Sequence, residues 1–181
     1  MSGQTTAIPR PAGYALSESA FLVALALLLP LMVHLLPSWD DSPLGAKLLS
    51  IFYAPLLAAA LGRTGLGLAA ALCSPWLNLL LTGKPLPPVA AMLMVELVLF
   101  TTIARALIHY RGIRAWTGPA SYLLLKPVTC LLLVLFPNWM PWATPLGAVT
   151  GAVLNAWPGI VVLTLIGWAL RRYPPTPGLS A

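Results

Sequence analysis

Long apolar runs, separated by short segments that contain proline, glycine or charged residues, account for most of the chain. A helix that crosses the hydrocarbon core of a bilayer needs about 20 mostly apolar residues. The second run is short, so we expect it to be tilted or partly re-entrant. The pattern predicts an all-α membrane protein, a six-transmembrane-helix bundle, with helices at Glu18–Leu36, Lys47–Leu61, Gly65–Thr82, Pro88–Tyr110, Pro119–Phe136 and Pro145–Leu170.

The segments at the two ends of the chain are polar and contain several prolines. We expect residues 1–17 to form an irregular N-terminal cytoplasmic tail, residues 18–172 the transmembrane domain, and residues 173–181 a disordered C-terminal tail. The first apolar run is too long for the h-region of a typical signal peptide, and no clear small-x-small cleavage site follows it. We interpret it as a retained helix.

The composition supports a membrane location. Of the 181 residues, 59% are hydrophobic and only 8% are charged, whereas a soluble globular chain has about 25% charged residues. The formal charge of +6 does not indicate a nucleic-acid partner, because the lysines and arginines stand singly or in pairs between apolar runs. We therefore expect the lipid bilayer to surround the protein, and we expect no nucleic acid to bind it.

The basic residues also predict an orientation. Cytoplasmic segments of membrane proteins carry an excess of Lys and Arg. With both termini in the cytoplasm, the outer side carries Lys47 and Lys84. The inner side then carries Arg10, Arg63, Arg105, Arg111, Arg114, Arg171 and Arg172. We predict a multi-pass protein of the cell (cytoplasmic) membrane, the inner membrane, with both termini cytoplasmic.

One carboxylate, Glu96, lies within the apolar stretch AAMLMVELVLFTTIA, residues 90–104. A charge stranded in hydrocarbon costs at least ~2.5 kcal/mol. From the rise of an α-helix, Glu96 lies about 12 Å and Asn155 about 15 Å from the outer ends of their helices. Lys126 also falls within the bilayer core. We expect Glu96 to face a polar interior that it shares with Lys126 and Asn155.

The charges of Glu96 and Lys126 admit three interpretations. If their helices adjoin, the two side chains form an ion pair, which either holds the bundle together or takes part in function. Buried pairs often add no net stability relative to apolar residues, and this favours a functional role. In the third interpretation, Lys126 snorkels to the inner interface and leaves Glu96 protonated.

Amide and proline residues extend this polar interior. In NAWPGI, Pro158 cannot donate to the carbonyl of Leu154, and such a carbonyl is tolerated in a membrane only where protein or a cavity satisfies it. Asn78 and Asn155 each lie in a helical stripe of small residues, which is typical of close helix packing. Their central amides favour a cavity wall. Trp157 is expected either to pack in the core or to offer a stacking face to a flat ligand.

The sequence contains none of the motifs that would indicate catalysis. It has no Walker loop, so we do not expect this chain to hydrolyse ATP, and no GxSxG or HExxH motif of a hydrolase. His, Cys and acidic residues do not cluster at ligand spacing. We predict that the protein is not an enzyme and has no metal site and no cofactor.

Three stretches resemble the substrate-binding S components of energy-coupling factor (ECF) transporters. They are FYAPLLAAALGRTGLGLAAALCSPWLNLLLTGKPLPP, AMLMVELVLFTTIARAL and GAVLNAWPGIVVLTLIGWALRR. The resemblance extends over Glu18–Arg172 and implies a six-helix protein that captures a vitamin or related micronutrient from outside. The first outer loop, PSWDDSPLGA, is shorter than the lid of many members.

The resemblance also implies sites and partners. ECF coupling and ATPase subunits on separate chains would drive transport, and an Ala-xxx-Ala signature in the first helix, matched by Ala20 and Ala24, would dock on the coupling subunit. Substrate would bind in the outer half of the bundle. The implied binding residues are Asn78, Glu96 and Asn155 as hydrogen-bonding groups, Trp157 for stacking, and Lys126 as a charge or a lock on Glu96.

A second interpretation comes from a different class of protein. Small six-helix scaffolds of the rod-shape-determining, MreD-like type do not transport, and in such a protein the Glu96–Lys126 pair would be structural. A scaffold would fill its centre with side chains. A capture subunit would leave a ligand-sized void near Glu96 and Trp157, so the two interpretations predict different interiors.

Overall fold

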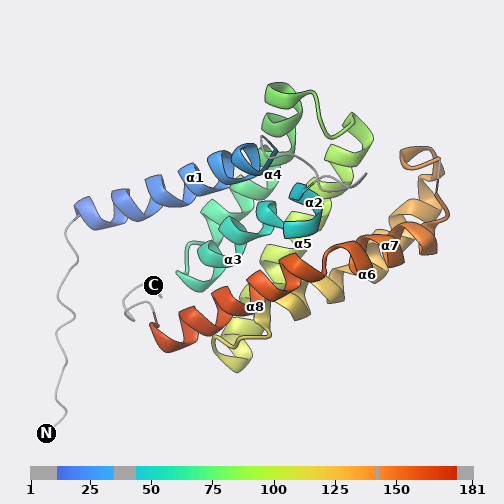
Figure 1. The fold of residues 1–181 in the computed structure, drawn as a ribbon. Helices are drawn as coiled ribbons and strands as arrows, with labels where there is room; N and C mark the ends of the chain where they lie inside the picture. Colours follow the sequence, from blue (N-terminus) through green and yellow to red (C-terminus); the bar gives the residue numbers. More distant parts are fainter. Residues whose placement is uncertain (1–11, 35–43, 142, 175–181) are drawn as a thin grey trace, which may run out of the picture.

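In the computed structural model of the protein, every regular element among the described residues, 12–34, 44–141 and 143–174, is a helix (Figure 1). Residues 1–11 and 175–181, which belong to the two predicted tails, lie outside this description. The elements are α1 (Ala12–His34), α2 (Leu44–Leu48), η1 (Ser50–Phe52), α3 (Tyr53–Ala60), α4 (Thr64–Thr82), α5 (Pro87–Arg111), α6 (Thr117–Leu135), η2 (Pro137–Trp139), α7 (Pro145–Asn155) and α8 (Trp157–Arg172).

Three helices, α4, α5 and α6, are long and apolar enough to cross a membrane. The pair α7 and α8 makes a fourth if it is one span, although it bends by 57° at the break between the two helices. The apolar part of α1, Ser19–Val33, and the segment Ser50–Ala60 are shorter. The described chain therefore has three or up to four candidate spans, and the count of six stays a prediction.

Two predicted helices differ from those in the structure. Helix α1 begins at Ala12, so the last part of the expected irregular tail, residues 12–17, is helical. The run Lys47–Leu61 is not one helix, because Leu49 adopts a left-handed backbone with φ of 53° and separates α2 from η1 and α3. A left-handed residue cannot continue a right-handed helix, and Leu adopts this conformation only under constraint from its surroundings.

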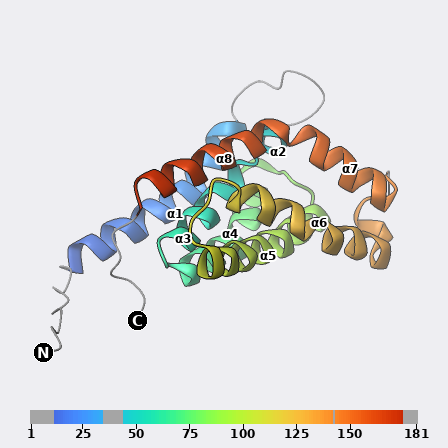
Figure 2. The ribbon, with the colours of Figure 1, turned by 90° about the horizontal axis from the view of Figure 1, so that it is seen from below.

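The core forms where α3 and η1 pack against α4, α5 and α6. The ring of Phe52 lies edge-on to Phe100 and Tyr122, with centroid distances of 5.0 and 5.5 Å. Edge-to-face pairs of this kind add stability beyond the area that they bury. In Figures 1 and 2, α5 lies along one side of α6. The bent α7–α8 pair lies along another side of α6.

Close backbone contacts hold α8 against the rest of the molecule. A Cβ added at Gly159 would lie 2.6 Å from the backbone carbon of Leu48 in α2, and one at Gly167 would lie 2.8 Å from the carbonyl oxygens of Arg114 and Ala115. Only a residue without a side chain allows this approach. By contrast, α7 contains no buried residue, so the two halves of the bent pair differ in how firmly they are packed.

The antiparallel order of the helices places the arginines at one end of the bundle. Arg63 precedes α4, Arg111 ends α5, Arg114 lies in the turn before α6, and Arg171 is in the last turn of α8. Lys84 lies in the loop between α4 and α5, at the opposite end. The two ends of the bundle therefore differ in charge, and which end faces the cytoplasm stays a prediction.

Candidate functional site

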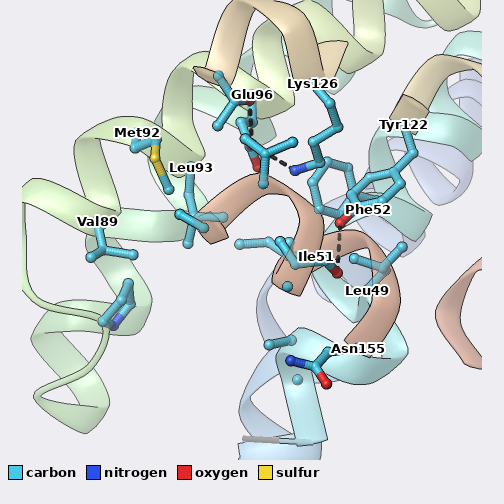
Figure 3. Close-up of a pocket in the computed structure, with 18 of the residues that line it drawn as sticks. Leu49, Ile51, Phe52, Val89, Met92, Leu93, Glu96, Tyr122, Lys126 and Asn155 are labelled. Atoms are coloured by element: carbon cyan, nitrogen blue, oxygen red, sulfur yellow. Dashed lines mark hydrogen bonds and ion pairs between the residues drawn. The ribbon is translucent and has the colours of Figure 1, made fainter. Parts of the chain in front are cut away.

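A cavity of about 600 Å³ lies between η1, α5, α6 and α7 (Figure 3). Its lining is mostly apolar and includes Leu49, Phe52, Val89, Met92 and Leu93. Four of the five residues predicted to bind substrate also line it, namely Asn78, Glu96, Lys126 and Asn155. The size falls in the range of small-molecule sites, which are about 300–1,000 Å³ and combine apolar walls with a few polar groups.

Glu96 and Lys126 form a buried ion pair in this cavity. Lys126 Nζ donates to Glu96 Oε1 over 2.7 Å, and the hydroxyl of Thr129, one turn further along α6, donates to the same oxygen over 2.6 Å. The ammonium group also lies 4.4 Å from the centroid of the Tyr122 ring, in cation–π geometry. Both charges are therefore stabilised by contacts within the protein.

The antiparallel packing of α5 and α6 explains why these charges meet. Glu96 lies nine residues after Pro87, which begins α5, and Lys126 lies nine residues before Leu135, which ends α6. At about 1.5 Å per residue the two are at the same depth, roughly 14 Å from this end of the bundle. Figure 3 shows the two side chains pointing toward each other, as the first two interpretations of these charges require.

Two buried polar side chains on the cavity wall have no hydrogen-bond partner among the described residues. The side chain of Asn78, on α4, is only 6% exposed, and its amide makes no hydrogen bond there. Ser50, in η1, is 3% exposed, and its hydroxyl makes none either. The polar atoms of both side chains are accessible from the cavity and not sealed in the core, so they can form hydrogen bonds with a bound molecule or with water.

Ser50 is absent from the sequence-predicted site. The signal available was a single hydroxyl in the apolar run LLSIFY. A serine in a membrane helix usually donates to the carbonyl four residues earlier, as Ser121 does to Thr117 over 2.7 Å. Because the chain changes direction at Leu49, η1 instead turns Ser50 to the cavity.

Asn155 and Trp157 stand on either side of the helix break, and only one of them reaches the cavity. Asn155, the last residue of α7, lines it, and Figure 3 shows this amide on a part of the wall separate from the ion pair. The side chain of Trp157, the first residue of α8, is 66% exposed and does not line the cavity. The structure therefore does not bring Trp157 together with the other four predicted residues.

The predicted docking residues lie on the surface of α1. Ala20 and Ala24 are both exposed, one helical turn apart, and they share this face with the exposed side chains of Phe21 and Leu28. The opposite side of the helix is buried, at Leu22 and Ala26. The side chains of Ala20 and Ala24 therefore lie on the exposed face of α1.

Comparisons with protein-family models, curated proteins and solved structures find no match to this chain. Among the described residues, no group of three or more His, Cys, Asp or Glu side chains is arranged to hold a metal ion. The lining of the cavity combines amide and hydroxyl groups and an internally paired carboxylate with mostly apolar side chains.

Proposed function

We propose that the protein is the substrate-capture subunit of a micronutrient uptake system, of the kind formed by ECF S components. The observation that carries the proposal is the cavity of about 600 Å³ with Asn78 and Ser50 unsatisfied on its wall. A small molecule bound in this cavity would fill the volume and satisfy these two polar groups. Binding of a small molecule is the function that explains both the volume and the polar groups.

In this proposal the chain crosses the inner membrane six times, with both termini and the arginine-containing end in the cytoplasm. The cavity then lies toward the outer half of the bundle, because Glu96 is nearer the Lys84 end of α5 than its arginine end, and because Pro85 and Val89 at the Lys84 end also line the cavity. α1 and the segment Ser50–Ala60 would complete the six spans as short or tilted helices. Coupling and ATPase subunits on other chains would engage the exposed face at Ala20 and Ala24.

The alternative, a non-transporting MreD-like scaffold, accounts less well for the interior. A scaffold gains stability from close packing, and each unfilled volume in a core costs free energy. The Glu96–Lys126 pair alone fits either function, because buried pairs also serve as structural links. The void beside the pair and the unsatisfied amide of Asn78 favour capture over scaffolding.

Native mass spectrometry tests this proposal. The protein is purified in a mild detergent from its own membranes and compared with an Asn78→Leu variant, which keeps the side-chain volume but removes the amide. A small-molecule adduct on the parent that falls at least tenfold in the variant supports capture. Trp157→Leu is the matched control, because Trp157 lies outside the cavity and its replacement should leave the adduct unchanged. A parent protein without an adduct contradicts the proposal.

A further inference from the structure

We propose that the captured molecule is uncharged at neutral pH, with a largely apolar body and one amide-like edge that Ser50 and Asn78 recognise. This inference rests on the proposed function and specifies the class of substrate.

The first step concerns the ion pair. Glu96 and Lys126 are only 2.7 Å apart, and each has a further stabilising contact, Thr129 for the carboxylate and the Tyr122 ring for the ammonium. A ligand that carried its own charges to these groups would have to separate a pair that is already satisfied. Removing one partner from a buried charge is among the most costly changes in a protein interior. The pair is therefore expected to stay closed when the ligand binds.

The second step concerns the net charge of the site. Among the described residues that line the cavity, Glu96 and Lys126 are the only charged ones, and their charges cancel. A cationic or anionic ligand would therefore bring an uncompensated charge against a mostly apolar lining. Such a charge is strongly disfavoured unless an opposite charge meets it. The lining thus selects against ligands of either sign.

The third step concerns the groups that remain available. The hydroxyl of Ser50 and the amide of Asn78 make no hydrogen bonds within the described chain, whereas the carboxylate of Glu96 is already engaged by Lys126 and Thr129. An amide both donates and accepts, as does a hydroxyl. Their natural complement is a neutral edge with adjacent donor and acceptor atoms, such as a lactam, a carboxamide or a ring imide.

The apolar part of the cavity lining determines where the rest of the ligand lies. Ile51, Val89, Met92, Leu93 and Val149 form an apolar part of the lining and offer no polar side-chain group other than the weakly accepting Met sulfur. Small-molecule sites orient a ligand through a few polar contacts and gain most of their affinity from apolar burial. The polar edge of the ligand should therefore contact Ser50 and Asn78, and its hydrocarbon or aromatic body should contact these side chains.

The test uses the molecule that elutes from the purified parent protein as its probe. Its net charge at pH 7 is measured by capillary electrophoresis against a neutral marker. The same molecule is then titrated onto the parent and onto the double variant Glu96→Gln/Lys126→Met, which removes both charges at nearly constant volume. We expect an uncharged molecule, and a dissociation constant in the folded double variant within about threefold of the parent, because the pair does not meet the ligand as a charge.

Each outcome separates this inference from the function on which it rests. An eluted molecule with a net charge, or one that is zwitterionic, overturns the inference but leaves the capture function standing. The inference is also overturned if the double variant, with unchanged gel-filtration behaviour, binds the eluted molecule more than tenfold more weakly than the parent. The capture function stands in that case too. If no molecule elutes from the parent, the capture function itself fails. The electrophoretic measurement needs only the parent protein, so poor folding of the variant does not remove the test.

Discussion

Replacing Lys126 by Met is the perturbation whose effect follows most directly from the structure. Met has a similar length but no charge, so the substitution leaves Glu96 as a buried carboxylate without a cation. The two side chains are 7% and 5% exposed, for Lys126 and Glu96 respectively. Solvent outside the protein therefore screens the remaining charge poorly.

The size of the effect can be worked out from the contacts. At 2.7 Å the attraction between the two charges is about 6 kcal/mol at an effective dielectric constant of about 20, before desolvation is subtracted. Breaking buried pairs typically costs about 3–5 kcal/mol. Because Thr129 still donates to Glu96 and the adjacent cavity is large enough for water, we expect about 3 kcal/mol of lost unfolding free energy.

A double-mutant cycle isolates the pair from the other effects of substitution. Unfolding of the parent, Lys126→Met, Glu96→Gln and the double variant is followed by tryptophan fluorescence in mixed detergent micelles. The double variant should lie within about 1 kcal/mol of the parent, since no charge is left unpaired. The interaction energy should then be at least about 2 kcal/mol. The reasoning would be refuted if the double variant lost as much unfolding free energy as the two single variants together.

Three further predictions follow from the packing and the topology. Gly159→Ala should lower the unfolding free energy by about 1–3 kcal/mol in the same assay, because its Cβ would collide with the backbone of α2, whereas Gly65→Ala, with nothing within 4 Å, should cost nothing. Phe52→Ala should cost about 3 kcal/mol through loss of its ring contacts, and a stability close to that of the parent would contradict the core described above. In a background without native cysteines, Leu86→Cys should react with a membrane-impermeant maleimide in intact cells and Tyr110→Cys should not; the reverse pattern would invert the orientation.

The contact between Glu96 and Lys126 could be predicted from the sequence because it depends mainly on the positions of the two residues along two adjacent helices. Their helices, α5 and α6, are long, strongly apolar and joined by a short turn, so the helical rise places both residues within the bilayer core. The cost of an isolated charge in hydrocarbon then requires a partner. The polar amides in two stripes of small residues favoured a cavity wall for Asn78 and Asn155, and both residues line the cavity in the structure.

The parts that sequence reasoning missed depend on where the backbone breaks. No glycine or proline marks Leu49, yet its left-handed conformation divides the predicted second helix and turns Ser50 to the cavity. The direction of Trp157 depends on the break at Ala156, since a shift of one residue rotates a helical side chain by about 100°. Tertiary contacts, such as Gly159 against α2, decide these positions, and a linear pattern does not contain them.

A structure of the protein purified from its own membranes and held in a lipid nanodisc tests the central claim most directly. The account predicts density for a compact, non-lipid molecule in the cavity, within hydrogen-bond distance of Asn78 and Ser50, with the Glu96–Lys126 pair still closed. A cavity collapsed by side chains, or one filled by a lipid acyl chain that leaves the amide of Asn78 unsatisfied, would contradict it.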